Sequence, residues 1–164
     1  MRTDLPGRAK LAPRFEAVTE LTFTVFRLNG LVLRWGDELL ASLDLTSARW
    51  QMLAAIALVG APRTAPQVGA ALGMTRQGAQ KQLHFLLGKG LVELRPNPAH
   101  KRSPLYVLTP LGHRLNRQAE ALWAHRAAEL AALLPTAQVR AATLALGSML
   151  RRLQAEAPAA EVDW

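Results

Sequence analysis

The sequence predicts a mainly α-helical fold with one small β-hairpin, and three observations support this prediction. Ala and Leu are abundant, whereas runs of Val and Ile are few, which favours helices over sheets. Apolar residues recur at spacings of three and four along most of the chain, as they do on one face of a helix. Two short segments, 91–95 and 105–108, are typical of strands, and the proline-rich basic stretch between them is typical of a long hairpin tip.

The composition excludes several classes of protein. Half of the 164 residues are hydrophobic, so the chain as a whole is expected to fold. It has no Cys, which excludes disulfides, cysteine-based zinc sites and cysteine nucleophiles. The N-terminus has no apolar signal segment, and the longest apolar stretches are far too short to span a membrane. We therefore expect a cytoplasmic protein without a membrane partner.

The first periodic segment is expected to form one long helix, from about Phe15 to Ser42. A helix of roughly 28 residues is about 42 Å long, which exceeds what a core of this size needs. Packing against a second copy of the chain is therefore favoured over packing within the monomer, although Gly30 and Gly36 interrupt the apolar stripe. The stripe consists of Val18, Leu21, Val25, Leu28, Val32, Trp35 and Leu39.

Three short helices are expected next, each with its own start or stop signal. Thr46 or Ser47 can cap the first of them, because a hydroxyl accepts a hydrogen bond from an unpaired amide at a helix start. Gly73 suits a left-handed turn after the second helix, and Thr75 can cap the third. The three helices cover about 48–59, 65–72 and 76–87.

Two longer helices are expected after the hairpin. Thr109 and Pro110 form a start signal for the first, since proline is favoured at the first position of a helix. The chain restarts at Pro135, and the last helix again carries apolar residues at spacings of three and four. We expect Leu146, Met149 and Leu153 on this helix to join the apolar stripe of the first helix in a homodimer interface.

The positive charge of the chain is concentrated in its central third. The net charge is +8, but residues 1–46 carry six basic and six acidic side chains, and residues 118–164 carry four and five. Residues 47–117 carry ten basic side chains and one acid, Glu93. A block of one sign within a foldable segment indicates a polyanionic partner, and charge alone leaves DNA, RNA and a membrane surface open.

The predicted order of elements, three short helices followed by a hairpin with a basic tip, is that of a winged helix-turn-helix. We expect this domain at residues 48–109. In such a domain the second helix of the turn pair enters the major groove of double-stranded DNA, where Gln, Arg and Lys can read base edges. The helix start also favours phosphate, and the wing tip can reach the backbone or the minor groove. The candidate DNA-binding residues are Thr75, Arg76, Gln77, Gln80, Lys81, His84, Lys101 and Arg102.

Five short motifs, in their order and spacing, resemble those of the MarR family of regulators (multiple antibiotic resistance). When the helices that flank the winged helix-turn-helix are included, the resemblance covers residues 15–155. The matching motifs are Leu45–Trp50 (LTSARW), Val68–Gly73 (VGAALG), Thr75–Gln77 (TRQ), Gly90–Glu93 (GLVE) and Leu108–Gly112 (LTPLG). The resemblance implies a homodimeric transcription regulator, expected to be a repressor, on a pseudo-palindromic operator. It also implies release by a small aromatic or hydrophobic ligand, and no cofactor or metal.

The chain is expected to divide into five parts. They are an N-terminal arm (1–14), a dimerisation helix (15–47), the winged helix-turn-helix (48–109), two C-terminal dimerisation helices (110–156) and a tail (157–164). The dimerisation residues are Val18, Leu21, Val25, Leu28, Leu146, Met149 and Leu153.

The sequence departs from the family pattern in two places. Wing tips of the family usually carry acids where this chain has Asn97 and His100, which puts the usual acid–arginine pairing in doubt. Gly78 stands where the family commonly has Thr or Ser. Gly78 either removes a base contact or allows a closer approach of the backbone.

The sequence also bears on two other classes of function and on one ligand site. An enzyme is disfavoured, because no metal-ligand pair, paired carboxylates or phosphate loop is visible. A winged-helix module for protein–protein contact is the alternative, but the intact basic set on helix and wing argues against it. Trp35, Trp50 and Trp123 could border an effector pocket, although ordinary core or interface positions explain them better.

Overall fold

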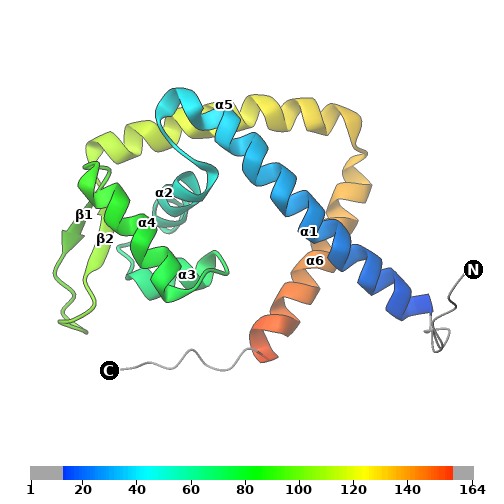
Figure 1. Cartoon of the computed structure of the whole chain (residues 1–164), viewed down its shortest axis with the longest axis horizontal. Coiled ribbons are helices and arrows are strands. Elements are labelled where there is room, and N and C mark those ends of the chain that lie inside the picture. The colour runs from blue at the N-terminus through cyan, green and yellow to red at the C-terminus, as the bar shows by residue number, and fades with distance from the viewer. Residues whose placement is uncertain (1–12, 157–164) are drawn as a thin grey trace, which may run out of the picture. The chain divides into compact units, whose positions relative to one another are not determined.

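The computed structural model describes residues 13–156 and confirms a mainly helical fold with one two-stranded hairpin (Figure 1). The chain divides into two compact units, the first ending at Glu120 and the second beginning at Ala121. Most of the expected N-terminal arm, residues 1–12, and the whole expected tail lie outside the described residues. The first unit contains the predicted winged helix-turn-helix.

Helix α1 (Pro13–Leu40) begins and ends two residues earlier than predicted, and a short 3-10 helix η1 (Ala41–Leu43) follows it. Leu40 is the one α1 residue that is buried. Near its end, α1 is joined to the start of α2 through Ser47, whose backbone N–H donates to Asp37 Oδ1 (2.6 Å) and whose Oγ donates to the Leu33 carbonyl (3.0 Å).

Gly36 allows this junction, although the sequence pattern marked it only as an interruption of the helix. A Cβ added to Gly36 would overlap Ser47 Oγ. The absence of a side chain therefore lets the buried Ser47 lie directly against α1. Glycine within a helix lowers its stability. At this position, however, it permits the close packing of α1 against the start of α2.

Helix α2 (Ser47–Val59) begins as predicted, because Thr46 is its N-cap and accepts a hydrogen bond from the Arg49 amide (3.4 Å). Gly60 is its C-cap and has a left-handed conformation (φ 62°). Met52, Leu53 and Ile56 are buried and form the centre of the core with residues from the following elements. The end of α1 also packs against this helix.

Helices α3 (Ala65–Ala71) and α4 (Arg76–Gly88) form the helix-turn-helix. Thr64 caps α3 in a reciprocal arrangement with Gln67, and Gly73 turns the chain with a φ of 64°. The two helices approach closely at Gly69, where an added Cβ would lie 3.1 Å from the Met74 carbonyl oxygen and 3.2 Å from the Ala79 Cβ. Val68, Leu83 and Leu86 fill the space between α2, α3 and α4 and are fully buried.

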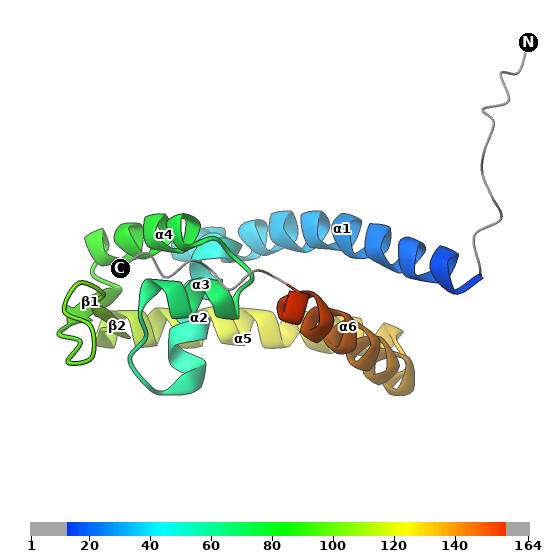
Figure 2. The same ribbon diagram turned by 90° about the horizontal axis from the view of Figure 1, so that it is seen from below.

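The wing consists of β1 (Val92–Arg95) and β2 (Leu105–Leu108), paired antiparallel with Val92 opposite Leu108 and Arg95 opposite Leu105 (Figures 1 and 2). Arg63, in the loop before α3, adds a third segment to this sheet. Its N–H donates to the Tyr106 carbonyl (3.2 Å) and its carbonyl accepts from the Tyr106 N–H (2.7 Å). The sequence pattern did not predict this bridge, which attaches β2 to the helix-turn-helix.

Helix α5 (Pro110–Leu133) starts in the first unit and continues into the second, where α6 (Thr136–Glu156) follows. As predicted, Thr109 precedes the start of α5, where its Oγ1 accepts from the Gly112 N–H (3.0 Å). Among the described residues no single helix is long and apolar enough to cross a membrane. Helices α5 and α6 taken together, with the bend between them, do reach the length and apolar composition of a membrane span.

An ion pair joins the loop before α2 to the residue that follows α4. Lys89 Nζ donates to Asp44 Oδ2 (2.9 Å), and this hydrogen bond, with the positive charge of Lys89, holds the pKa of the Asp44 carboxyl below its ordinary value. Because the pKa is lowered, the pair stabilises the fold at pH values above the ordinary carboxyl range. That contribution is lost as the pH falls through the lowered pKa.

We expect Lys89→Gln to raise the pKa of Asp44 towards its ordinary value, because the substitution removes the charge of the partner. Both side chains are exposed, so the accompanying change in stability is small. Carboxyl-carbon NMR titration measures the pKa. Glu129 is an internal control, because its pKa is also lowered but by a hydrogen bond from Arg126. A shift of both carboxyls would contradict the assignment of the effect to Lys89.

Candidate nucleic-acid interface

One face of α4 is exposed and carries the candidate base-reading residues together. The opposite face packs into the core through Ala79, Leu83 and Leu86, which recur at spacings of four and three. This periodicity turns the intervening polar residues outward. The exposed residues are Arg76, Gln77, Gln80, Lys81 and His84, in agreement with the face predicted from the sequence.

The start of α4 is well defined. Thr75 Oγ1 accepts a hydrogen bond from the Gly78 N–H (3.1 Å) and is the N-cap, as predicted. Gly78 contributes to this cap, because a Cβ added there would lie 3.1 Å from Thr75 Oγ1. The glycine therefore leaves room for the capping hydroxyl. The remaining N–H groups of the first turn and the helix dipole favour an anion at this end of α4.

Gln80 is held by the wing. Its Nε2 donates to the hydroxyl of Tyr106 (2.8 Å), and Tyr106 is itself buried in β2. The recognition helix and the wing are thus joined by a side-chain hydrogen bond between residues 26 positions apart in the sequence. Sequence reasoning placed Gln80 correctly on the exposed face but did not find its partner.

The tip of the wing is braced by Asn97. Its Nδ2 donates to the Ser103 carbonyl (2.8 Å), and its Oδ1 accepts from the Ala99 N–H (3.1 Å). Backbone hydrogen bonds from His100 to Asn97 and from Ser103 to His100 complete the turn. A neutral amide thus holds the loop at Asn97, where wing tips of the family usually carry an acid. Lys101 and Arg102 are exposed at this tip.

The electrostatics of this surface are strongly one-sided. Glu93 is the single acid among residues 47–117, and its Oε1 already accepts from Arg95 Nη2 (3.1 Å) and Nε (3.3 Å). The exposed cations of α4 and of the wing tip therefore have no acid beside them on these two elements. Such a surface attracts a polyanion and can release counterions from it.

The aromatic residues of α4 and the wing, Phe85 and Tyr106, do not form an exposed stacking platform. The Arg49 guanidinium covers the ring of Phe85 at 3.5 Å from its centroid, and Tyr106 is buried. Binding of single-stranded nucleic acid relies on exposed aromatic faces. The surface therefore suits a duplex better than a single strand.

The candidate dimerisation residues lie on the apolar faces of α1 and α6, each described within its own unit. Val18, Leu28 and Leu153 are more than half exposed, at 55%, 52% and 54%. Leu21, Val25, Leu146 and Met149 are partly buried. Sequence reasoning missed Phe23 and Phe26, which are also exposed on α1 and pack edge to face with ring centroids 6.2 Å apart.

The three candidate effector residues lie on different helices. Trp35 is half-buried in α1, Trp50 is half-buried in α2, and Trp123, on α5, belongs to the second unit. Among residues 13–156 no group of three or more His, Asp or Glu side chains could hold a metal ion.

A family model and similar solved structures both indicate the MarR family. The sequence model of the MarR family matches residues 43–103. An uncharacterized protein of Mycobacterium tuberculosis is 42% identical over 100 residues, which make up 61% of this chain and 68% of that protein. A crystal structure of a MarR family transcription regulator has a TM-score of 0.72 at 26% identity and covers 88% of this chain and 97% of its own.

A further similar structure contains nucleic acid. It is a mutant of the Escherichia coli MarR protein complexed with operator DNA, with a TM-score of 0.68 and 27% identity. The similarity covers 85% of this chain and 96% of that one.

Proposed function

Since the chain belongs to the MarR family of winged-helix transcription regulators, we propose that it binds a specific double-stranded operator as a homodimer and represses transcription. The observation that carries this proposal is the exposed face of α4 beside a braced basic wing tip. Side chains that can read base edges and cations that can bind phosphate are exposed there, and the one acid of α4 and the wing, Glu93, is paired with Arg95. The operator DNA in the complex of the E. coli protein supports the same role for this chain.

Selection from random duplex DNA tests the proposal directly. The full chain is incubated with a pool of random duplexes, and bound fragments are amplified and sequenced. We expect an inverted repeat, because a twofold-symmetric dimer places two copies of α4 on two half-sites about 34–36 Å apart. Absence of any enriched sequence would contradict the proposed function. Enrichment of single half-sites would contradict the dimer but not the DNA reader.

The homodimer is a second testable prediction. Large apolar side chains stay exposed on α1 and α6, and burial of such surfaces between two copies is the usual basis of an obligate dimer. We expect sedimentation equilibrium at micromolar concentration to give a dimer mass. Replacement of Val18 and Leu28 by Glu should produce monomers or unfolded chains, because charges would replace buried apolar groups.

Leu58→Glu is the matched control for this experiment. Leu58 is 89% exposed, but it lies on α2 and not on the apolar faces of α1 and α6. We expect this variant to remain a dimer. A folded wild-type monomer at micromolar concentration would refute the dimer proposal.

Release by a small aromatic or hydrophobic ligand completes the proposal, with Trp35, Trp50 and Trp123 as the candidate contacts. Indole fluorescence responds to a ligand that binds beside the ring. Compounds that release the wild-type protein from DNA are therefore tested on each Trp→Phe variant. Indole fluorescence is recorded with and without each compound. If all such compounds act equally on the three variants, the tryptophans do not contact an effector.

A further inference from the structure

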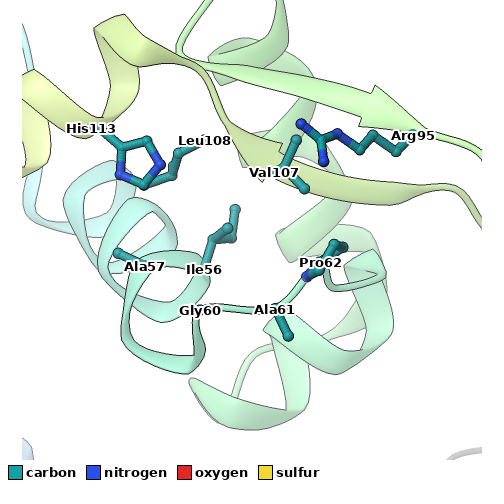
Figure 3. Close-up of a pocket in the computed structure, with 9 residues that line it drawn as sticks. All are labelled: Ile56, Ala57, Gly60, Ala61, Pro62, Arg95, Val107, Leu108 and His113. Carbon is teal, nitrogen blue, oxygen red and sulfur yellow. The ribbon is translucent and has the colours of Figure 1, made fainter.

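Tyr106 is held in place on several sides. It is 3% exposed, its N–H donates to the Arg63 carbonyl (2.7 Å), and its carbonyl accepts from the Arg63 N–H (3.2 Å). Strand β1 pairs with it on the other side. Strand β2 also packs against α2, and Figure 3 shows Leu108 of β2 and Ile56 of α2 lining the same small pocket. The hydroxyl of Tyr106 is therefore a fixed point of the wing.

The amide of Gln80 is bonded to this fixed hydroxyl, although Gln80 is an exposed residue of α4. Its Nε2 donates to the hydroxyl oxygen of Tyr106 at 2.8 Å. A buried phenol hydroxyl is usually hydrogen-bonded, because an unpaired one loses its hydration without compensation. The pair is therefore favoured in the free protein, before any ligand binds.

This hydrogen bond determines which groups of Gln80 remain for a ligand. An amide nitrogen carries two hydrogens and the amide oxygen is an acceptor, so one N–H and Oε1 stay available. These are the two groups with which glutamine bonds N7 and N6 of adenine in the major groove. Gln80 also lies within the first two turns of α4, the part of a recognition helix that contacts base edges.

Gln77 provides a contrast on the same helix. It is exposed on the same face of α4, but among the described residues its side chain has no hydrogen-bond partner. A mobile side chain loses rotational freedom when it binds a base, which weakens binding by roughly twofold to tenfold. For Gln80 part of this loss has already occurred during folding.

We propose that Tyr106 is a positioning residue for base recognition, which holds the Gln80 amide in the orientation that reads adenine at one fixed position of each half-site. The inference rests on the proposed function, since it requires an operator. Tyr106 acts through Gln80, because its own ring is buried. The wing thereby contributes to specificity through β2, separately from the cations at its tip.

The first test uses the full chain without DNA. We expect nitrogen NMR relaxation of the side-chain amides to show a rigid Nε2 for Gln80 and a mobile Nε2 for Gln77. Tyr106→Phe should make the Gln80 amide as mobile as that of Gln77. Equal mobility of the two amides in the wild-type chain would overturn the inference. That comparison needs no variant, so it remains decisive if Tyr106→Phe weakens the fold.

The second test is selection from random duplexes with the wild-type chain and three variants. Gln80→Ala identifies the base pair that Gln80 reads, because the preference for adenine is lost there. Tyr106→Phe keeps the ring and removes only the hydroxyl, so we expect the preference at that same base pair to fall by roughly twofold to tenfold and the other positions to keep theirs. Gln77→Ala is the matched control and should leave that base pair unaffected.

The outcomes separate this inference from the proposed function. A loss in Tyr106→Phe that is spread over all positions would show that the hydroxyl only supports the wing, and would overturn the inference. A change at a base pair other than the one Gln80 reads, or a preference there for a base other than adenine, would overturn it too. A wild-type chain that enriches no sequence would overturn the proposed function and base reading with it, whereas the relaxation data would still decide whether Tyr106 orients Gln80.

Discussion

Replacement of Gln80 or Lys81 by Ala is expected to narrow the difference in binding free energy between operator and random DNA. The expected reduction is about 1–3 kcal/mol for each good base contact removed. Both side chains are exposed on α4, on the face opposite the buried Ala79 and Leu83. Base edges in the major groove carry the sequence information, so removal of a hydrogen bond there weakens operator binding in particular. Titration of operator and scrambled duplexes across a series of salt concentrations measures both affinities.

The wing variants are the counterpart in this experiment. Lys101→Ala combined with Arg102→Ala is expected to weaken binding to both duplexes alike, since phosphate contacts carry little sequence information. Removal of one cation–phosphate pair should reduce the slope of log affinity against log salt by about one, counted in both protomers. If the wing variant abolishes discrimination while the α4 variants keep it, the assigned roles of helix and wing are reversed.

Gln80 needs one further variant, because its side chain is also bonded to Tyr106. Tyr106→Phe removes the hydroxyl and leaves Gln80 in place. We expect Gln80→Ala to reduce discrimination in the Tyr106→Phe background as well, which would show that Gln80 acts on DNA and not only on the wing. If Gln80→Ala has no further effect in that background, its role is to position the wing.

Gly112→Ala is expected to destabilise the fold by about 1–3 kcal/mol, because an added Cβ would overlap the Leu91 carbonyl oxygen. That carbonyl cannot easily move away, since it accepts a hydrogen bond from the Thr109 N–H (3.1 Å). Thr109 Oγ1 in turn donates to the Gly90 carbonyl (2.7 Å) at the turn before β1. Urea unfolding measures the change in the free energy of unfolding.

Gly30→Ala is the control for this prediction. Gly30 also lies in a helix, but an added Cβ would meet only the end of the Arg34 side chain, at 3.8 Å. We expect this variant to be more stable than wild type by about 0.5–1 kcal/mol, because alanine favours the helix. Equal effects of the two substitutions would refute the proposed close contact at Gly112.

Several features of this chain could be predicted because their causes are local. The caps at Thr46 and Thr75 depend on residues within one helical turn, and Gly73 is suited to a left-handed turn in any fold. The exposed face of α4 follows from the helical period of its apolar residues. These short-range rules also located the candidate reading helix and the basic wing tip.

The sequence by itself thus determined which segments are helices and strands, where they start, and which face of α4 is polar. The tertiary structure alone decided what those segments touch. The bridge from Arg63 to Tyr106, the hydrogen bond from Gln80 and the close approach at Gly36 join residues 43, 26 and 11 positions apart. No period or capping rule reaches that far, because such contacts form only when packing of the core brings distant backbones together.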